Sequence, residues 1–134
     1  ARAARTVVIR EWLDSGVHVA LGSDTPTGPW YKPQVTLSGA VWRADAAGNP
    51  FHPEQEITIQ EALRAHTMGS AYAAFEEKAK GSLETGKLAD LVVWNDNIYS
   101  LTPLEIAQTD IALTMIGGKI VYQTLAQPPR MRSR

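Results

Sequence analysis

The chain has 134 residues, of which 44% are hydrophobic and 20% are charged; its formal net charge is -1 and it contains no cysteine. This composition is typical of a soluble globular protein, excludes disulfides and thiol catalysis, and gives no basic footprint for nucleic acid. No apolar run reaches the ~18 residues that a membrane-spanning helix needs. The lack of cysteine fits a cytoplasmic protein, which is our expectation. Any metal must be held by His, Asp or Glu.

The first residues predict a helix that leads directly into a strand. Apolar residues recur at the spacing of one buried helix face as far as Asp14, and Gly16 then provides a stop. Because this helix has no recognisable start, we expect the chain to begin within a structural element. The strand should have bulky residues on one face and small or polar residues on the other. The first face carries Val17, Val19 and Leu21, and the second carries His18, Ala20, Gly22 and Asp24.

Asp24 stands at the end of this strand and is the main candidate for a functional residue. A buried strand with an acid at its carboxyl end suits a parallel barrel, in which catalytic groups gather at that end. A second interpretation is equally open. Ser23-Asp24-Thr25-Pro26 is also good turn chemistry and could simply end the strand.

Residues 25–33 predict a loop beside Asp24, because prolines and a glycine interrupt both helix and strand. Trp30 and Tyr31 could line a pocket there, although packing against the core is the commoner role of such aromatics. A helix over 34–44 follows, with Arg43 near its end, where a cation suits the helix dipole. Residues 45–56 predict a second loop, in which His52 is a weak candidate ligand because no second histidine stands at a chelating spacing.

Thr58-Ile59-Gln60-Glu61 forms a capping box, which predicts a helix from there to about Phe75. His66 lies in this helix among small and apolar residues. We therefore interpret His66 as a hydrogen-bonded core histidine rather than a ligand.

From Gly81 the pattern changes to strands. Residues 88–94 are a short apolar run rich in β-forming residues, and residues 102–105 repeat the capping box with proline at the first helical position. Two strands, 111–116 and 119–122, flank Gly117-Gly118, the two-residue link that a tight hairpin turn with positive φ requires. The tail after Gln123 should be loosely held.

Three stretches resemble, in the same order, the C-terminal part of the amidohydrolase superfamily. GVHVALGSD (16–24) resembles the last barrel strand, and EALRAHT (61–67) with GSLETGKLADLVV (81–93) resembles the helix and the return to the small β-sandwich of these enzymes. DIALTMIGGKIVY (110–122) is similar to the final hairpin, particularly in the amidohydrolase 3 group of YtcJ-like proteins. The resemblance covers nearly all of residues 1–123.

The resemblance implies an α/β fold, namely the last part of a metal-dependent hydrolase (β/α)8 barrel together with part of a small β-sandwich. Asp24 corresponds to the aspartate that in this superfamily ligates the metal and accepts a proton from the attacking water, which hydrolyses an amide or cyclic-amide C–N bond rather than a peptide bond. The implied cofactor is a divalent metal, with zinc as the first expectation, whose other ligands lie outside this chain. His18 shares the face of Asp24 but lies ~20 Å along the strand, so we do not expect it to be a co-ligand.

We therefore expect residues 1–80 to supply the last strand and helices of the barrel, residues 81–123 the C-terminal strands of the sandwich, and residues 124–134 a flexible tail. The expected partners are a small-molecule substrate and either an N-terminal segment of the same protein or further copies of the chain; neither nucleic acid nor membrane is expected. The alternative is a non-catalytic fragment or association module that lacks the other metal ligands. The sequence leaves open the substrate and the roles of Trp30, Arg43 and His52.

Overall fold

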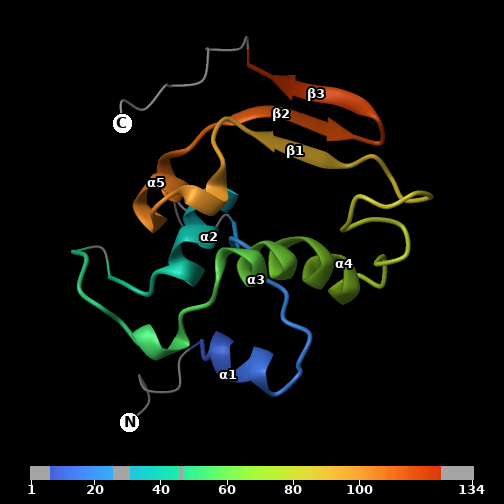
Figure 1. Cartoon of the computed structure of the whole chain (residues 1–134). Helices are drawn as coiled ribbons and strands as arrows, with labels where there is room; N and C mark the ends of the chain where they lie inside the picture. The colour runs from blue at the N-terminus through green and yellow to red at the C-terminus, as the bar shows by residue number, and fades with distance from the viewer. Residues whose placement is uncertain (1–6, 26–30, 46, 125–134) are drawn as a thin grey trace.

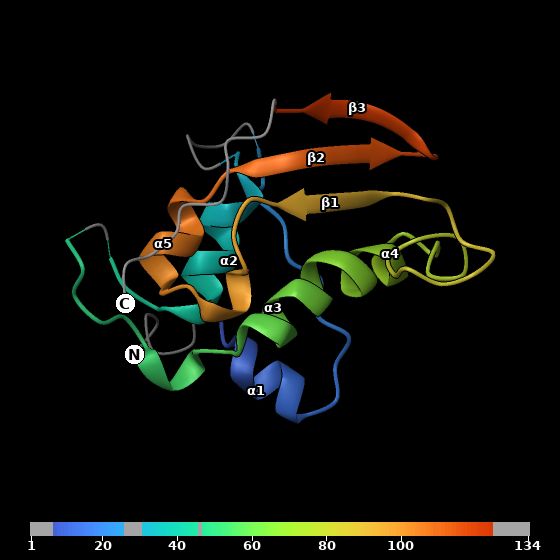
Figure 2. The same cartoon turned by 45° about the horizontal axis from the view of Figure 1, so that its top comes forward.

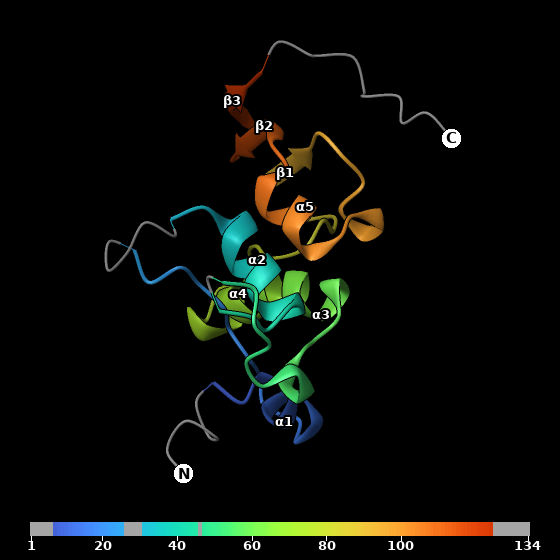
Figure 3. The same cartoon turned by 90° about the vertical axis from the view of Figure 1, so that its left-hand side faces the viewer.

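The computed structural model describes residues 7–25, 31–45 and 47–124, in which short helices are combined with a three-stranded antiparallel sheet (Figure 1). The elements, in chain order, are α1 (Ile9–Asp14), α2 (Pro33–Val41), η2 (Pro53–Gln55), α3 (Ile59–Arg64), η3 (Ala65–Gly69), α4 (Ser70–Ala73), β1 (Leu91–Trp94), η4 (Ile98–Ser100), α5 (Pro103–Gln108), β2 (Ile111–Ile116) and β3 (Lys119–Gln123). The sheet lies at one end of the molecule and α1 at the other, with α2, α3 and α5 between them (Figure 3). Within the described ranges, none of the helices combines the length and apolarity needed to cross a membrane.

Two helices begin at the capping boxes that the sequence predicts. The Thr58 hydroxyl accepts a hydrogen bond from the Glu61 backbone N–H at 3.2 Å, and the Glu61 carboxylate accepts one from the Thr58 N–H at 2.8 Å. Thr102 and Glu105 repeat this arrangement at the start of α5, where Pro103 occupies the first helical position. Each box satisfies N–H groups that a helix start leaves without intrahelical partners. The boxes therefore fix where α3 and α5 begin.

The helix predicted as far as Phe75 is confirmed, but it is not a uniform α-helix. It passes from α3 into the π-helical turn η3 and ends with α4 at Ala73, and Phe75 follows with a φ of +60°. A π turn closes each hydrogen bond over five residues instead of four and frequently occurs at functional sites. Here the turn lies against the extended segment that leads to Asp24, through a hydrogen bond from Leu21 to Ala65.

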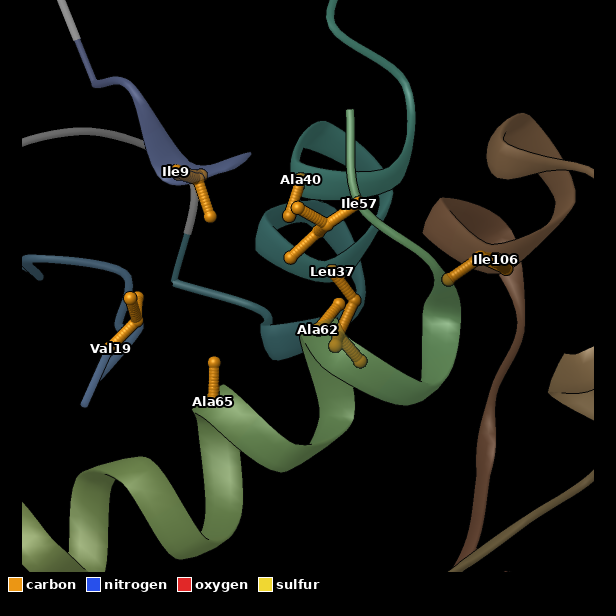
Figure 4. Packing of buried hydrophobic residues seen from close by; sticks show 8 residues of the cluster. All are labelled: Ile9, Val19, Leu37, Ala40, Ile57, Ala62, Ala65 and Ile106. Atoms are coloured by element: carbon orange, nitrogen blue, oxygen red, sulfur yellow. The ribbon is translucent and has the colours of Figure 1, made fainter. Parts of the chain in front are cut away.

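The hydrophobic core forms where α2, α3 and α5 meet (Figure 4). Leu37 of α2 and Ile106 of α5 are its largest fully buried side chains. Burying a side chain of this size stabilises a fold by roughly 1.5–3 kcal/mol, so these contacts hold the helices together. The complete buried cluster consists of Ile9, Val19, Leu37, Ala40, Ile57, Ala62, Ala65 and Ile106.

The sheet confirms the predicted hairpin and the strand before it. Its order is β1-β2-β3, and β1 begins at Leu91 rather than at Leu88. Gly117 and Gly118 join β2 to β3 with φ values of +56° and +78°, the positive values that this tight turn requires. In two views β1 lies nearest the helices and β3 farthest from them (Figures 1 and 2). Every residue of β3 is exposed, and within the described residues β1 and β3 are the edges of the sheet.

The predicted strand from Val17 to Asp24 is wrong, because this segment is neither a β-strand nor a helix. Within the described residues no ladder of backbone hydrogen bonds runs along it. A strand needs a neighbouring strand for its ladder, and the elements beside this segment are helices. Periodicity in the sequence identifies an extended segment with two different faces, but it cannot supply the pairing partner.

Candidate functional site

Asp24 lies at the end of this segment, on the face that the sequence predicts to be small or polar, and it is exposed. Val19 is buried and Leu21 packs against the core, whereas every second residue from His18 to Asp24 is exposed. The predicted alternation of faces is therefore confirmed over this part of the segment. Val17 departs from it, since it is 54% exposed and lines a pocket of about 280 Å³.

The backbone of Asp24 has a φ of +52°, in the left-handed region. Aspartate tolerates this conformation better than most residues because its short polar side chain can bond locally. A turn follows at Thr25, whose hydroxyl oxygen lies 2.9 Å from that of Ser23. Asp24 thus ends the extended segment and also opens a turn, so the turn chemistry noted in the sequence is present.

The described residues do not by themselves fit a metal. Among them, no group of three or more His, Cys, Asp or Glu side chains comes close enough to hold an ion, and a closed protein site needs at least three such donors. The His18 ring is stacked on the Tyr72 ring, with centroids 4.1 Å apart, which gives it a packing role. Asp24 is thus a single candidate donor in this part of the chain.

His66 is half-buried in η3, as expected for a histidine of the core. Its Nε2 lies 3.1 Å from the Thr36 hydroxyl oxygen, within hydrogen-bond distance. Burial lowers the pKa of His66, because a charged ring would lose solvation. The ring is thereby favoured as a neutral partner of Thr36.

Arg43 and His52 both belong to the loop region after α2. Helix α2 ends at Val41, so Arg43 follows the helix instead of closing it. Arg43 is buried and its guanidinium lies over the Phe51 ring, 5.7 Å from the centroid. The His52 Nδ1 lies 2.9 Å from the Glu54 carboxylate. The backbone N–H of Glu54 and then the His52 ring lower the pKa of that carboxyl group, because both hydrogen-bond its charged form. These contacts hold the loop in shape.

Of the two aromatic residues predicted in the first loop, only one belongs to the part of the chain that the structure describes. Tyr31 is described and is 63% exposed, so it does not pack against the core. Trp30 lies outside the described residues, and its predicted choice between pocket and core is untested.

A large open groove of about 790 Å³ separates the helices from the sheet. Its helical side includes His66 and Ser70, and its sheet side includes Trp94 and Met115. A volume of this size falls in the range of small-molecule sites. Asp24 is not among the residues that line it, so the groove and the candidate carboxylate are separate features.

Sequence reasoning missed Gly69, which lies at the end of the π turn. A methyl group added at its Cα would come within 2.0 Å of the Val19 carbonyl oxygen. The sequence contained one hint of this contact, since an isolated glycine within a helical pattern often has a packing reason. The groove could not have been found in the sequence, because its walls come from segments far apart in the chain.

A family model described as "Amidohydrolase family" matches residues 1–122. N-substituted formamide deformylase of Arthrobacter pascens is 35% identical over 115 residues, which are 86% of this chain and 21% of that protein. The Bacillus subtilis protein named "Putative amidohydrolase YtcJ" is 31% identical over 114 residues, covering 83% of this chain and 21% of that protein. The chain therefore spans about one fifth of the length of these relatives.

One solved structure adds a comparison of folds. A mutant of atrazine chlorohydrolase TrzN from Arthrobacter aurescens, complexed with zinc and atraton, superposes with a TM-score of 0.60 and 27% identity. The superposition covers 89% of this chain and 29% of that one. The arrangement of helices and sheet described above is therefore shared with an enzyme of much greater length.

Proposed function

The chain belongs to the amidohydrolase family, and we propose that it is the C-terminal part of a longer enzyme that hydrolyses amide or cyclic-amide C–N bonds other than peptide bonds. The observation that carries the proposal is the position of Asp24. It is exposed at the end of a segment whose backbone is hydrogen-bonded to a helix, from the Leu21 N–H to the Ala65 carbonyl. The relatedness to a formamide deformylase supports the reaction class. The substrate is a small molecule, and no nucleic acid or membrane is involved.

In this proposal Asp24 is the general base. Its carboxylate accepts a proton from the attacking water and returns it to the leaving nitrogen, so that the amine departs neutral. A divalent cation, which we propose to be zinc as in the TrzN complex, would lower the pKa of the attacking water. The described residues do not form a site for it, so Asp24 would be one of several ligands and the others would lie elsewhere in the protein.

The proposed architecture assigns residues 1–80 to the last part of a (β/α)8 barrel and residues 81–123 to the C-terminal strands of a β-sandwich, with 124–134 as a tail. Two features support this assignment. The segment 17–24 has one covered and one open face, and the three-stranded sheet has exposed edges at β1 and β3. Both features are those of elements whose neighbours come from another part of a larger fold.

The second candidate is a non-catalytic association module. The lack of a metal-binding cluster among the described residues favours it, as do the exposed sheet edges. The two candidates differ in what they require of Asp24, because an association module has no use for a proton acceptor at this position.

The test is Asp24→Asn in the complete protein, assayed with a panel of N-substituted formamides and cyclic amides for release of amine and carboxylate. The amide cannot accept the proton, so turnover should fall by about 10²–10⁴-fold while the fold is retained. Asp110→Asn is a matched control, because Asp110 is also exposed but lies between α5 and β2. Turnover near the wild-type rate in Asp24→Asn would overturn the assignment, and a complete protein without metal or turnover would favour the association module.

A further inference from the structure

The π turn of the long helix holds the backbone of the segment that carries Asp24. The Leu21 N–H donates a hydrogen bond to the carbonyl of Ala65, the first residue of η3, at 3.2 Å. In a regular α-helix each carbonyl pairs with the N–H four residues later, whereas the π turn shifts the pairing by one residue. The Ala65 carbonyl therefore has different hydrogen-bond geometry from the carbonyls of α3, and it accepts the hydrogen bond from the Leu21 N–H.

Ser70 holds the same residue through its carbonyl. The Ser70 Oγ lies 3.2 Å from the carbonyl oxygen of Leu21 and 3.2 Å from that of Ala65. A hydroxyl has one hydrogen to donate, so it bonds one carbonyl at a time while remaining close to both. Both backbone groups of Leu21 are therefore engaged by a single turn of helix, three residues before Asp24.

Gly69 makes this contact sterically possible. The Cβ of an alanine there would lie 2.0 Å from the Val19 carbonyl oxygen and 3.0 Å from the Val19 carbonyl carbon. Those atoms are backbone, so they cannot move aside as a flexible side chain would. Any residue larger than glycine must push the helix and the segment apart by a distance on the order of 1 Å, which is enough to matter for catalytic geometry.

We propose that Gly69 and Ser70 are positioning residues, which set the place of Asp24 by fixing the backbone of residues 19–21 against the π turn. The inference rests on the proposed function, because it assumes that Asp24 acts on the substrate. The contacts of Leu21 with the helix are compatible with a neighbouring strand in the complete protein. In an extended segment the backbone N–H and C=O groups of successive residues point alternately to the two edges. Leu21 uses the helix edge, and the opposite edge is left for a strand.

The experiment compares three glycine variants of the complete enzyme. Gly69→Ala pushes the helix away from the Asp24 segment. Gly81→Ala provides a steric control from outside the helix, because its added Cβ would lie 2.8 Å from the Ala71 Cβ and 3.1 Å from the Met68 Sδ, so it presses on the same helix without contacting the segment. Gly39→Ala in α2 is the clash-free control, since apart from its chain neighbours and its own helix backbone no atom lies within 4 Å of its Cβ position. For each variant, kcat and KM are measured per folded molecule, and amide exchange is followed for the peptide that contains Leu21.

Gly69→Ala should lower kcat by about 100-fold with KM changed by less than about threefold, because a displaced base fails in the transition state more than in binding. Exchange at the Leu21 amide should accelerate at the same time. Gly81→Ala should lower the melting temperature but retain the wild-type kcat per folded molecule. Gly39→Ala should also retain kcat and should raise the melting temperature slightly, because alanine is the better helix former. Equal kcat in Gly69→Ala and Gly81→Ala would overturn the proposal, since it would leave Gly69 with a structural role alone.

A milder pair of variants keeps the test decisive if Gly69→Ala does not fold. Ser70→Ala removes only the hydroxyl that bridges Leu21 and Ala65, and should lower kcat by about tenfold; Ser70→Thr retains a hydroxyl and should restore most of that loss. An unchanged kcat in Ser70→Ala would count against the proposal. Failure of the proposed function itself has a different signature, because Asp24→Asn would then turn over normally.

Discussion

The Arg10 guanidinium donates a hydrogen bond to the Glu61 carboxylate at 2.8 Å and thereby ties α1 to the start of α3. The same carboxylate closes the capping box with Thr58. The Thr58 backbone N–H and then Arg10 lower the pKa of Glu61, because both interactions favour the charged form. One side chain therefore begins a helix and joins it to another, 51 residues away along the chain.

Glu61→Gln should lower stability by a small amount that depends on pH. Glutamine can still serve in a capping box, so the variant loses mainly the charge facing Arg10. Since the folded-state pKa of Glu61 is lowered, its contribution is fully present above the ordinary value of 4.5 and is lost as the pH falls through the folded-state pKa. Urea unfolding at several pH values should show a difference from wild type at neutral pH that shrinks in acid. A difference that grows in acid would contradict this sign.

Leu37→Ala should destabilise the protein by about 2–5 kcal/mol, because the side chain is 2% exposed at the junction of α2 with its neighbours and the surrounding helices cannot fully close the cavity. Leu104→Ala is the control, since Leu104 is 58% exposed on α5 and should cost less than about 0.5 kcal/mol. Urea unfolding measures both. Similar losses in the two variants would contradict the described core.

Local signals predicted the starts of two helices and the final hairpin correctly. Both capping boxes and the Gly117-Gly118 turn depend on residues within a few positions of one another, so the sequence contains all the information that they need. The predicted strand up to Asp24 failed for the opposite reason, because strand pairing depends on a partner far away in the chain. The π turn was also missed, since nothing in the local pattern distinguishes it from a continuing α-helix.

In the candidate site, too, features that depend on nearby residues could be predicted and features that depend on distant residues could not. Asp24 could be identified as a candidate from the alternation of residues and from the family resemblance, and in the structure it is exposed at the end of its segment. The contacts that hold the segment before Asp24 could not be predicted. Gly69 and Ser70 are about 50 residues away from residues 19–21 in the sequence and contact them only in the folded chain. The metal ligands remain a prediction for the rest of the protein.

The 134-residue chain alone should not bind zinc tightly. Asp24 is a single donor, and no cluster of three donors occurs within the described ranges, whereas tight protein sites for zinc use at least three. Titration calorimetry with zinc should therefore show only weak binding without fixed stoichiometry. A sub-micromolar one-to-one site that Asp24→Asn abolishes would show that this chain supplies further ligands.

The isolated chain should also self-associate, because its sheet has exposed edges with apolar residues beside them. Val121 of β3 is 58% exposed and Val92 of β1 is 46% exposed, and strand edges of this kind recruit further strands. Sedimentation of the purified chain at tens of micromolar should detect dimers or larger species. Val121→Lys places a charge on the edge strand and should shift the population toward monomer, whereas Leu104→Lys on the exposed side of α5 should not. A compact wild-type monomer would mean that the chain closes its own sheet, and the interpretation of these residues as part of a larger fold would then have to be given up in favour of an independent domain.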